Sequence, residues 1–219
     1  MIKFAPQLIN LFATLILLLS FAMISQRRIV SLVNLFMIQG AALVAASFLL
    51  GYATNQPDLY VSGALTLVLK VFLIPWMLHR MIRKLNVRWD IETLLNIPTT
   101  MLVGIALVIF AFSLALPISR LSDSIAGGSL GIALACVFLS FMMMITRSKA
   151  IPQVIGFLSM ENGLIFAATT VTNGMPMIVE FGIALDVLVG VLIMGVFMFQ
   201  IREKFDSLDI HHLETLKED

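Results

Sequence analysis

Blocks of about twenty apolar residues recur along the whole chain, and this spacing limits what the chain can fold into. A helix of roughly that length crosses a hydrocarbon core of about 30 Å. Backbone polar groups in lipid must also be satisfied inside their own segment, which a helix achieves. Seven such windows are separated by short stretches rich in charge or turn residues: 4–25, 29–53, 59–82, 99–116, 125–146, 150–171 and 176–200. The sequence therefore predicts an all-α integral membrane protein with about seven transmembrane helices.

The composition supports the same class. Hydrophobic residues make up 60% of the 219 residues and charged residues 12%, whereas soluble domains average roughly 45–50% apolar and about 25% charged. The excess must face lipid rather than water. The net charge of +1 hides a positional bias and gives no indication of nucleic-acid binding. Cys136 is the only cysteine, which excludes an intramolecular disulfide and a cysteine-cluster metal site. We expect no metal and no cofactor in this chain.

Eleven of the fourteen Lys and Arg residues lie at the ends of alternate windows. They follow the first, third, fifth and seventh windows: Arg27, Arg28, Arg80, Arg83, Lys84, Arg88, Arg147, Lys149, Arg202, Lys204 and Lys217. The intervening ends hold only Lys3 and Arg120, and Lys70 lies inside a window. Because basic residues concentrate on the cytoplasmic side, we expect the N-terminus outside, the C-terminus in the cytoplasm and an odd number of spans.

Two segments outside the windows are amphipathic. Residues 87–97 carry Trp89 and are typical of a short interfacial helix on the cytoplasmic side. In the cytoplasmic tail, 202–219, apolar residues recur at helical spacing, which predicts a short helix that docks on a cytoplasmic partner. His211 and His212 in this tail point about 100° apart on a helix. That spacing favours a solvated face over a shared metal.

Five ionisable residues lie inside the windows, away from the basic ends: Lys70, His79, Glu161, Glu180 and Asp186. A charge at the bilayer centre costs about 2.5–3.5 kcal/mol on insertion scales, so such residues tend to mark function. Lys70 lies near the middle of its window. Pro75 cannot donate a backbone hydrogen bond and crowds the carbonyl of Val71. A broken helix beside a buried amine indicates a water-filled proton or ion path; the alternative is a lysine paired to a carboxylate for assembly only.

Two acids also lie near the middle of their windows. Glu161 is in the sixth window and Asp186 in the seventh. Gly182 and Gly190 flank Asp186 at four residues on either side, and small residues allow close helix contact that would shield the carboxylate inside the bundle.

The other two ionisable residues lie nearer the window ends. Glu180 is one turn into the seventh window, near the outer surface. An acid at the exit of an ion path and an acid at the membrane interface both fit this position. His79 lies beside Arg80 at the cytoplasmic end of its window, which favours a snorkelling interfacial residue. The sequence has no nucleophile–base set, phosphate loop or cofactor fingerprint. The pattern indicates proton handling, and we expect the chain not to be catalytic by itself.

Three motifs in the last third of the chain are distinctive: SMENG at 159–163, FGIALDVLVG at 181–190 and FDSLDIHHLETL at 205–216. They resemble the carboxyl half of the hydrogenase-4 component E family. Over spans five to seven, 125–201, that family is similar to the three-helix K subunit of respiratory complex I. The resemblance divides the chain into a five-span region, 1–146, and two last spans, 147–201, which with span five are K-like.

The K subunit carries one buried glutamate on each of its last two helices. Asp186 matches the second of these as a shorter acid. The position of the first glutamate is occupied here by Leu158. Glu161 follows three residues later, about 4.5 Å along the helix and about 60° around it. A side chain one turn away on nearly the same face could take over the role.

The resemblance implies a subunit of a group 4 membrane hydrogenase, such as a formate hydrogenlyase-type complex, in a bacterial or archaeal cytoplasmic membrane. Its implied partners are antiporter-like and other membrane subunits, and a soluble redox arm that holds nickel-iron and iron-sulfur centres. We expect Lys70, Glu161 and Asp186, with Glu180 and His79, to contribute to a lateral proton or sodium path. The alternatives are a purely structural subunit that links the redox module to antiporter-like subunits, or a K-type subunit of a cation/proton antiporter.

Overall fold

The computed structural model describes residues 5–85, 96–119 and 129–172, together with four single helical positions at 182, 188, 190 and 195. Its elements are α1 (Ala5–Ser25), α2 (Ile29–Thr54), α3 (Asp58–Thr66), η2 (Leu67–Leu73), α4 (Ile74–Leu85), α5 (Ile97–Ser119), α6 (Ser129–Thr146) and α7 (Ala150–Thr172). These described ranges contain no strand. Six of their helices are long and apolar enough to cross a membrane.

The all-helical prediction is therefore confirmed, and the first six windows each contain one membrane-length helix. Apart from the four single positions, the seventh window lies outside the described residues. So do the tail at 202–219 and the predicted interfacial helix at 87–97, except for its last two residues. Six long apolar helices make this a multi-pass membrane protein.

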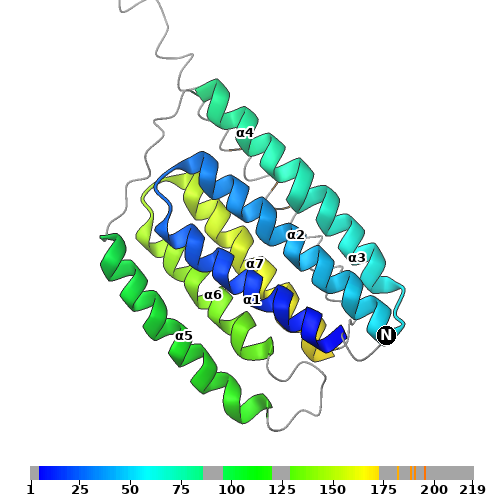
Figure 1. The fold of residues 1–219 in the computed structure, drawn as a ribbon. Helices are drawn as coiled ribbons and strands as arrows, with labels where there is room; N and C mark the ends of the chain where they lie inside the picture. Colours follow the sequence, from blue (N-terminus) through cyan, green and yellow to red (C-terminus); the bar gives the residue numbers. More distant parts are fainter. Residues whose placement is uncertain are drawn as a thin grey trace, which may run out of the picture.

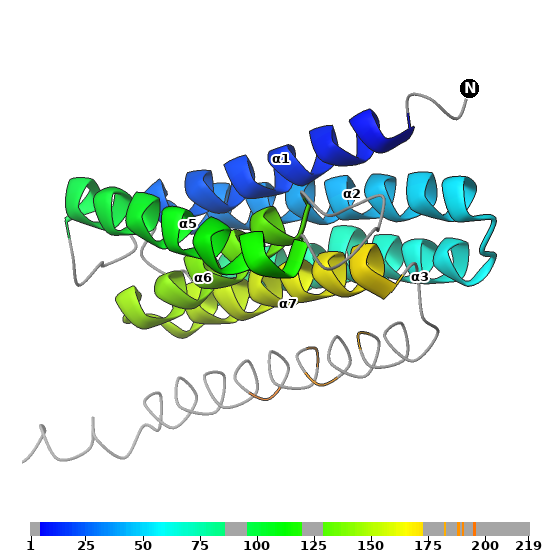
Figure 2. The ribbon, with the colours of Figure 1, turned by 90° about the horizontal axis from the view of Figure 1, so that it is seen from below.

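Four helices form the central bundle. In it α1 packs against α2 and α6, and α7 packs against the same two helices. Figure 1 shows α5 at one edge, next to α6, and the α3–η2–α4 helix at the other edge, next to α2. Figure 2 shows α1 and α7 on opposite faces of the bundle. The polar residues described below come from α1, α2, η2 and α7.

The turn between α2 and α3 is fixed by Asn55. Its φ of 58° is left-handed, and its backbone N–H donates to the carbonyl of Gly51. Asparagine tolerates this conformation at a helix end, where it satisfies a terminal carbonyl. Asp58 then lies in the first turn of α3, where a negative charge complements the helix dipole. The tight turn brings α3 back against α2.

The third span contains a π-helical segment at the place where Pro75 predicts a break. The helix stays continuous, but Leu67–Leu73 is π-helical, and the backbone N–H of Ile74 donates to the carbonyl of Leu69 five residues earlier. The predicted break is therefore a widening of the helix. Because Pro75 has no N–H to continue the α pattern, a shift of the hydrogen bonds to a five-residue spacing beside it is readily accommodated. Lys70 is the central residue of this segment.

Two apolar clusters fill the core, one toward each end of the bundle. The first includes Met23, Phe36, Ile74 and Leu158; the second includes Ile16, Ala42, Leu59 and Phe166. On α1, α2, the third span and α7, one cluster lies before and the other after a short polar stretch. The core is thus divided by a polar layer near the middle of the membrane-length helices.

Candidate functional site

The polar layer consists of Ser20 on α1, Gln39 on α2, Lys70 on η2, and Glu161 and Asn162 on α7. None of these side chains is more than 2% exposed. Residues from four helical segments converge at one level, although they lie up to 142 positions apart in the sequence (162 minus 20). Burial of this many polar groups costs free energy unless they bond to one another.

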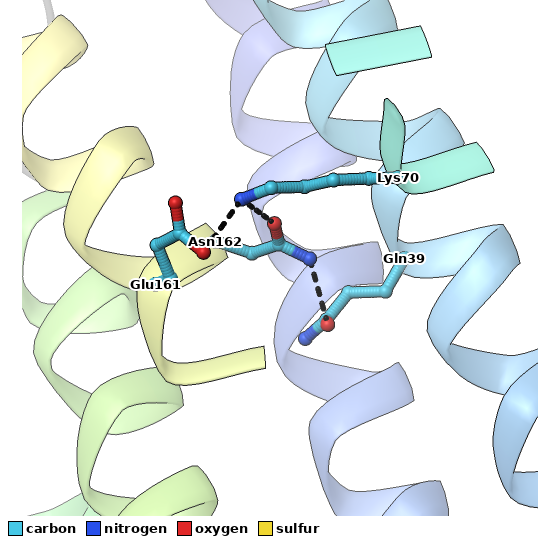
Figure 3. Close-up of polar contacts among 4 residues, drawn as sticks. All are labelled: Gln39, Lys70, Glu161 and Asn162. Carbon is cyan, nitrogen blue, oxygen red and sulfur yellow. Dashed lines mark hydrogen bonds and ion pairs between the residues drawn. The ribbon is translucent and has the colours of Figure 1, made fainter. Parts of the chain in front are cut away.

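Lys70 and Glu161 form an ion pair in this layer. Lys70 Nζ lies 3.3 Å from Glu161 Oε2, and the two side chains are 0% and 2% exposed. Figure 3 shows the two side chains pointing toward each other, from η2 and from α7. Each group supplies the counter-charge that makes burial of the other tolerable. The two residues predicted separately from their mid-window positions are therefore direct partners.

A chain of hydrogen bonds leads away from Lys70 toward α1. Lys70 Nζ donates to Asn162 Oδ1 at 3.0 Å, and Asn162 Nδ2 donates to Gln39 Oε1 at 3.2 Å (Figure 3). Gln39 Nε2 then donates to Ser20 Oγ at 2.9 Å, and Ser20 Oγ donates to the carbonyl of Ile16 at 3.0 Å. Each residue in this chain donates to the next one, from Lys70 to the carbonyl of Ile16. Successive hydrogen bonds arranged in this way strengthen one another. We call Asn162, Gln39 and Ser20 the amide arm.

Lys70 has two kinds of partner in the layer, the Glu161 carboxylate and the amide arm, and the two differ in chemistry. An ammonium and a carboxylate can exchange a proton across a direct contact. A side-chain amide donates through nitrogen and accepts through oxygen, so it holds a neighbour in place but has no group that readily gains and loses a proton. Lys70 and Glu161 can therefore exchange a proton, whereas the amide arm can only position the amine.

Glycines bring the helices of the layer close together. A Cβ on Gly40 would lie 3.6 Å from Lys70 Cβ, so α2 and η2 are already in contact beside the amine. A Cβ on Gly163 would lie 3.1 Å from Val137 and 3.3 Å from the carbonyl oxygen of Ala133, which is closer than ordinary packing. Small residues allow this approach in membrane helices. Gly163 therefore fixes the position of α7, and with it Glu161 and Asn162.

His79 is the one other predicted site residue that the structure describes, and it does not belong to this layer. His79 lies on α4, and its Nδ1 donates to the carbonyl of Pro75 at 2.8 Å. Since the carbonyl can only accept, Nδ1 carries the hydrogen in this contact. Glu180 and Asp186 lie outside the described residues. Gly182, four residues before Asp186, is buried, and a Cβ added there would lie 3.0 Å from Ile165 on α7.

Asn162, Gln39 and Ser20 are members of the layer that the sequence did not single out. Formal charge inside an apolar window marks Lys70 and Glu161, whereas neutral polar residues carry no such mark. A signal existed for Gln39, because a side-chain amide in the middle of an apolar window also needs a buried partner. Ser20 gave no signal, since serine is common in membrane helices and bonds to its own backbone.

Arg147 is a second buried cation, at the end of α6, and it is 2% exposed. Its Nη2 donates to the carbonyl oxygens of Ile24 at 2.6 Å and Met23 at 3.4 Å. These carbonyls belong to the last turn of α1, where a cation complements the helix dipole. Burial lowers the pKa of the guanidinium from its ordinary value. In the sequence, Arg147 indicates only the orientation of the chain, and its packing role gives no local signal.

Comparisons with known proteins extend over the full length of the chain. It is 31% identical over 204 residues to uncharacterized protein Rv0085 of Mycobacterium tuberculosis, and these residues make up 93% of each of the two chains. It is 22% identical over 210 residues to hydrogenase-4 component E of Escherichia coli strain K12, covering 96% of this chain and 97% of the relative.

No family model matches the chain, and no solved structure matches it. The resemblance expected from the carboxyl-terminal motifs is confirmed, and it includes spans one to four as well. The chain belongs to the family that contains uncharacterized protein Rv0085 and, more distantly, hydrogenase-4 component E.

Proposed function

We propose that this chain is a membrane subunit of a hydrogenase-type complex, and that Lys70 and Glu161 transfer protons within the membrane arm. The observation that carries the proposal is the buried ion pair, with Lys70 Nζ 3.3 Å from Glu161 Oε2. In the transfer, a proton leaves the ammonium for the carboxylate, which leaves a neutral amine and a neutral carboxyl group. Protons from neighbouring groups or water then restore the charged pair.

Two features support transfer over a static pair. An amine and a carboxyl group can each carry a proton, and Lys70 Nζ lies within direct reach of Glu161 Oε2, so a proton has a short path between them. Lys70 also lies on a π-helical segment, and such segments occur frequently at functional sites. A widened turn gives the lysine backbone an alternative hydrogen-bond pattern into which it can shift.

We infer the rest of the path and the assembly from the family and the charge pattern. Asp186, with Glu180 and His79, would continue the path from the pair, in a seventh span at 176–200 that is similar to the last helix of a K subunit. The N-terminus would lie outside and the C-terminus in the cytoplasm. Antiporter-like subunits and a soluble redox arm would be the partners, and that arm would hold the nickel-iron and iron-sulfur centres. The membrane would be the bacterial or archaeal cytoplasmic membrane.

A structural role is the second candidate, and the amide arm favours it. Asn162, Gln39 and Ser20 position Lys70 without being able to pass a proton on, as expected for a layer that fixes helix packing. In that case the ion pair would serve assembly alone. A third candidate, a K-type subunit of a cation/proton antiporter, predicts that the gene lies beside no gene for a nickel-iron large subunit.

The replacement Lys70→Met separates transfer from structure in the assembled complex. Methionine keeps most of the side-chain volume and removes the proton carrier. Under the proposal, the variant complex assembles and evolves hydrogen, but proton movement into inverted membrane vesicles is lost. Arg83→Met is the control, because Arg83 is an exposed cation on α4.

Three outcomes decide between the candidates. Proton movement that persists in a fully assembled Lys70→Met complex refutes transfer through this pair. Loss of the complex on blue-native gels, with a Lys70→Met chain that still folds on its own, supports the structural role. Loss of proton movement together with an intact, hydrogen-evolving complex supports the proposal.

A further inference from the structure

We propose that the polar layer is specific for protons and closed to sodium, because the Lys70 ammonium occupies the position that a bound alkali cation would take. The inference rests on the proposed function, since it names the ion that the same site handles. It assigns Lys70 a second role as the residue that determines ion specificity.

The oxygen atoms around Lys70 are those that would bind a metal cation. Carboxylate and carbonyl oxygens are the usual ligands of alkali cations in membrane proteins. Lys70 Nζ lies 3.0 Å from Asn162 Oδ1 and 3.3 Å from Glu161 Oε2. The amine is thus a tethered cation that already lies between a carbonyl oxygen and a carboxylate.

The remaining side-chain oxygens of the amide arm each already accept a hydrogen bond. Gln39 Oε1 accepts from Asn162 Nδ2, and Ser20 Oγ accepts from Gln39 Nε2. The π-helical segment adds no free carbonyl at Leu69, because Ile74 donates to it. A sodium ion entering the layer would therefore have to displace the amine and compete with the hydrogen bonds that these oxygens already accept.

Charge repulsion adds a large factor. Two unit positive charges about 4 Å apart, at an effective dielectric constant of about 20, repel by an amount that weakens binding roughly a thousandfold. A proton avoids this repulsion, because it moves on the amine and the carboxylate themselves. The same amine that carries the proton thus excludes the competing cation.

The test compares wild type with Lys70→Ser and Lys70→Met. Serine opens space beside Glu161 and Asn162 and carries a hydroxyl close to the η2 backbone, whereas methionine fills the space with an apolar side chain. Radioactive sodium binding and thermal stability in sodium-free and sodium-rich buffer are measured on the purified full chain. Proton movement and radioactive sodium uptake are measured on vesicles that carry the assembled complex.

We expect wild type to bind no sodium, to show the same thermal midpoint in both buffers, and to move protons at a rate independent of sodium. Lys70→Ser is expected to gain sodium binding and a higher midpoint in sodium, whereas Lys70→Met gains neither. Sodium binding or sodium uptake by wild type overturns the inference. So does a folded Lys70→Ser variant that shows no response to sodium.

If Lys70→Ser does not fold, sodium binding by wild type decides alone. Its presence overturns the inference and its absence supports it. Failure of the proposed function is visible separately, as proton movement that survives Lys70→Met while wild type still binds no sodium.

Discussion

The Lys70–Glu161 pair can be tested without its partners by removing the two charges singly and together. Lys70→Met and Glu161→Gln each change little volume, and each leaves the other charge buried without its counter-charge. Removing one partner of a buried ion pair costs about 3–5 kcal/mol, mostly because the remaining charge is uncompensated. We therefore expect each single variant to lose about that much of its free energy of unfolding.

The double variant should be more stable than either single variant. At the observed 3.3 Å, two unit charges attract by about 5 kcal/mol at an effective dielectric constant of about 20. This attraction mainly offsets the desolvation of the two groups, so removing both charges costs far less than the sum of the single losses. Replacement of whole buried pairs by neutral residues is often nearly neutral.

The assay is SDS-driven unfolding of the purified full chain in mixed micelles, followed by circular dichroism. A matched neutral pair provides the control. Ser140 Oγ on α6 lies 2.7 Å from Ser159 Oγ on α7, and hydrogen bonds of this kind in membrane proteins average about 0.6 kcal/mol in double-mutant cycles. A coupling between Lys70→Met and Glu161→Gln no larger than the about 0.6 kcal/mol expected for the two serines would refute the ion pair.

Three further predictions follow from the same packing. Gln39→Leu removes the acceptor of Asn162 Nδ2 and should cost about 1–3 kcal/mol; unchanged SDS unfolding would contradict the amide arm. Gly163→Val forces α7 away from Val137 and should cost about 1–3 kcal/mol. Gly195→Ala, which meets nothing within 4 Å, should leave the SDS midpoint unchanged. Arg147→Met removes the donor to the last carbonyls of α1 and should cost about 1.5–3 kcal/mol; it should also speed amide exchange in that turn, and unchanged exchange would exclude the capping role.

The helices could be predicted from the sequence because each apolar block is a local signal. Length and hydropathy decide whether a segment spans a membrane, and neither depends on the rest of the fold. Lys70 and Glu161 could be singled out for the same reason, since each is a charge in the middle of an apolar window. A carboxylate partner for Lys70 could be anticipated, but which carboxylate it is could not be predicted, because that depends on how η2 and α7 pack around α2. No periodicity in either window encodes that arrangement.

Pro75 shows a different limit. Its missing N–H is a local fact and predicts an interruption of the third span. Whether the chain breaks, kinks or widens depends on what surrounds it. Here α2 packs against η2, with Gly40 beside Lys70, so the helix stays in place and only its hydrogen-bond spacing changes. The local residue determines that an irregularity occurs, and the packing determines its form.

The position of the polar layer between the two apolar clusters determines the direction in which it can act. Along the bundle axis, Phe36 and Leu158 lie on one side of the layer, and Ile16 and Phe166 lie on the other. Within the layer, the polar contacts run across the bundle, from α7 and η2 to α2 and α1. The arm toward α1 ends at a helix carbonyl and consists of amides and a hydroxyl. Under the proposed transfer, a proton exchanged by Lys70 would therefore move across the bundle, to the carboxylate of Glu161 that the amine contacts directly.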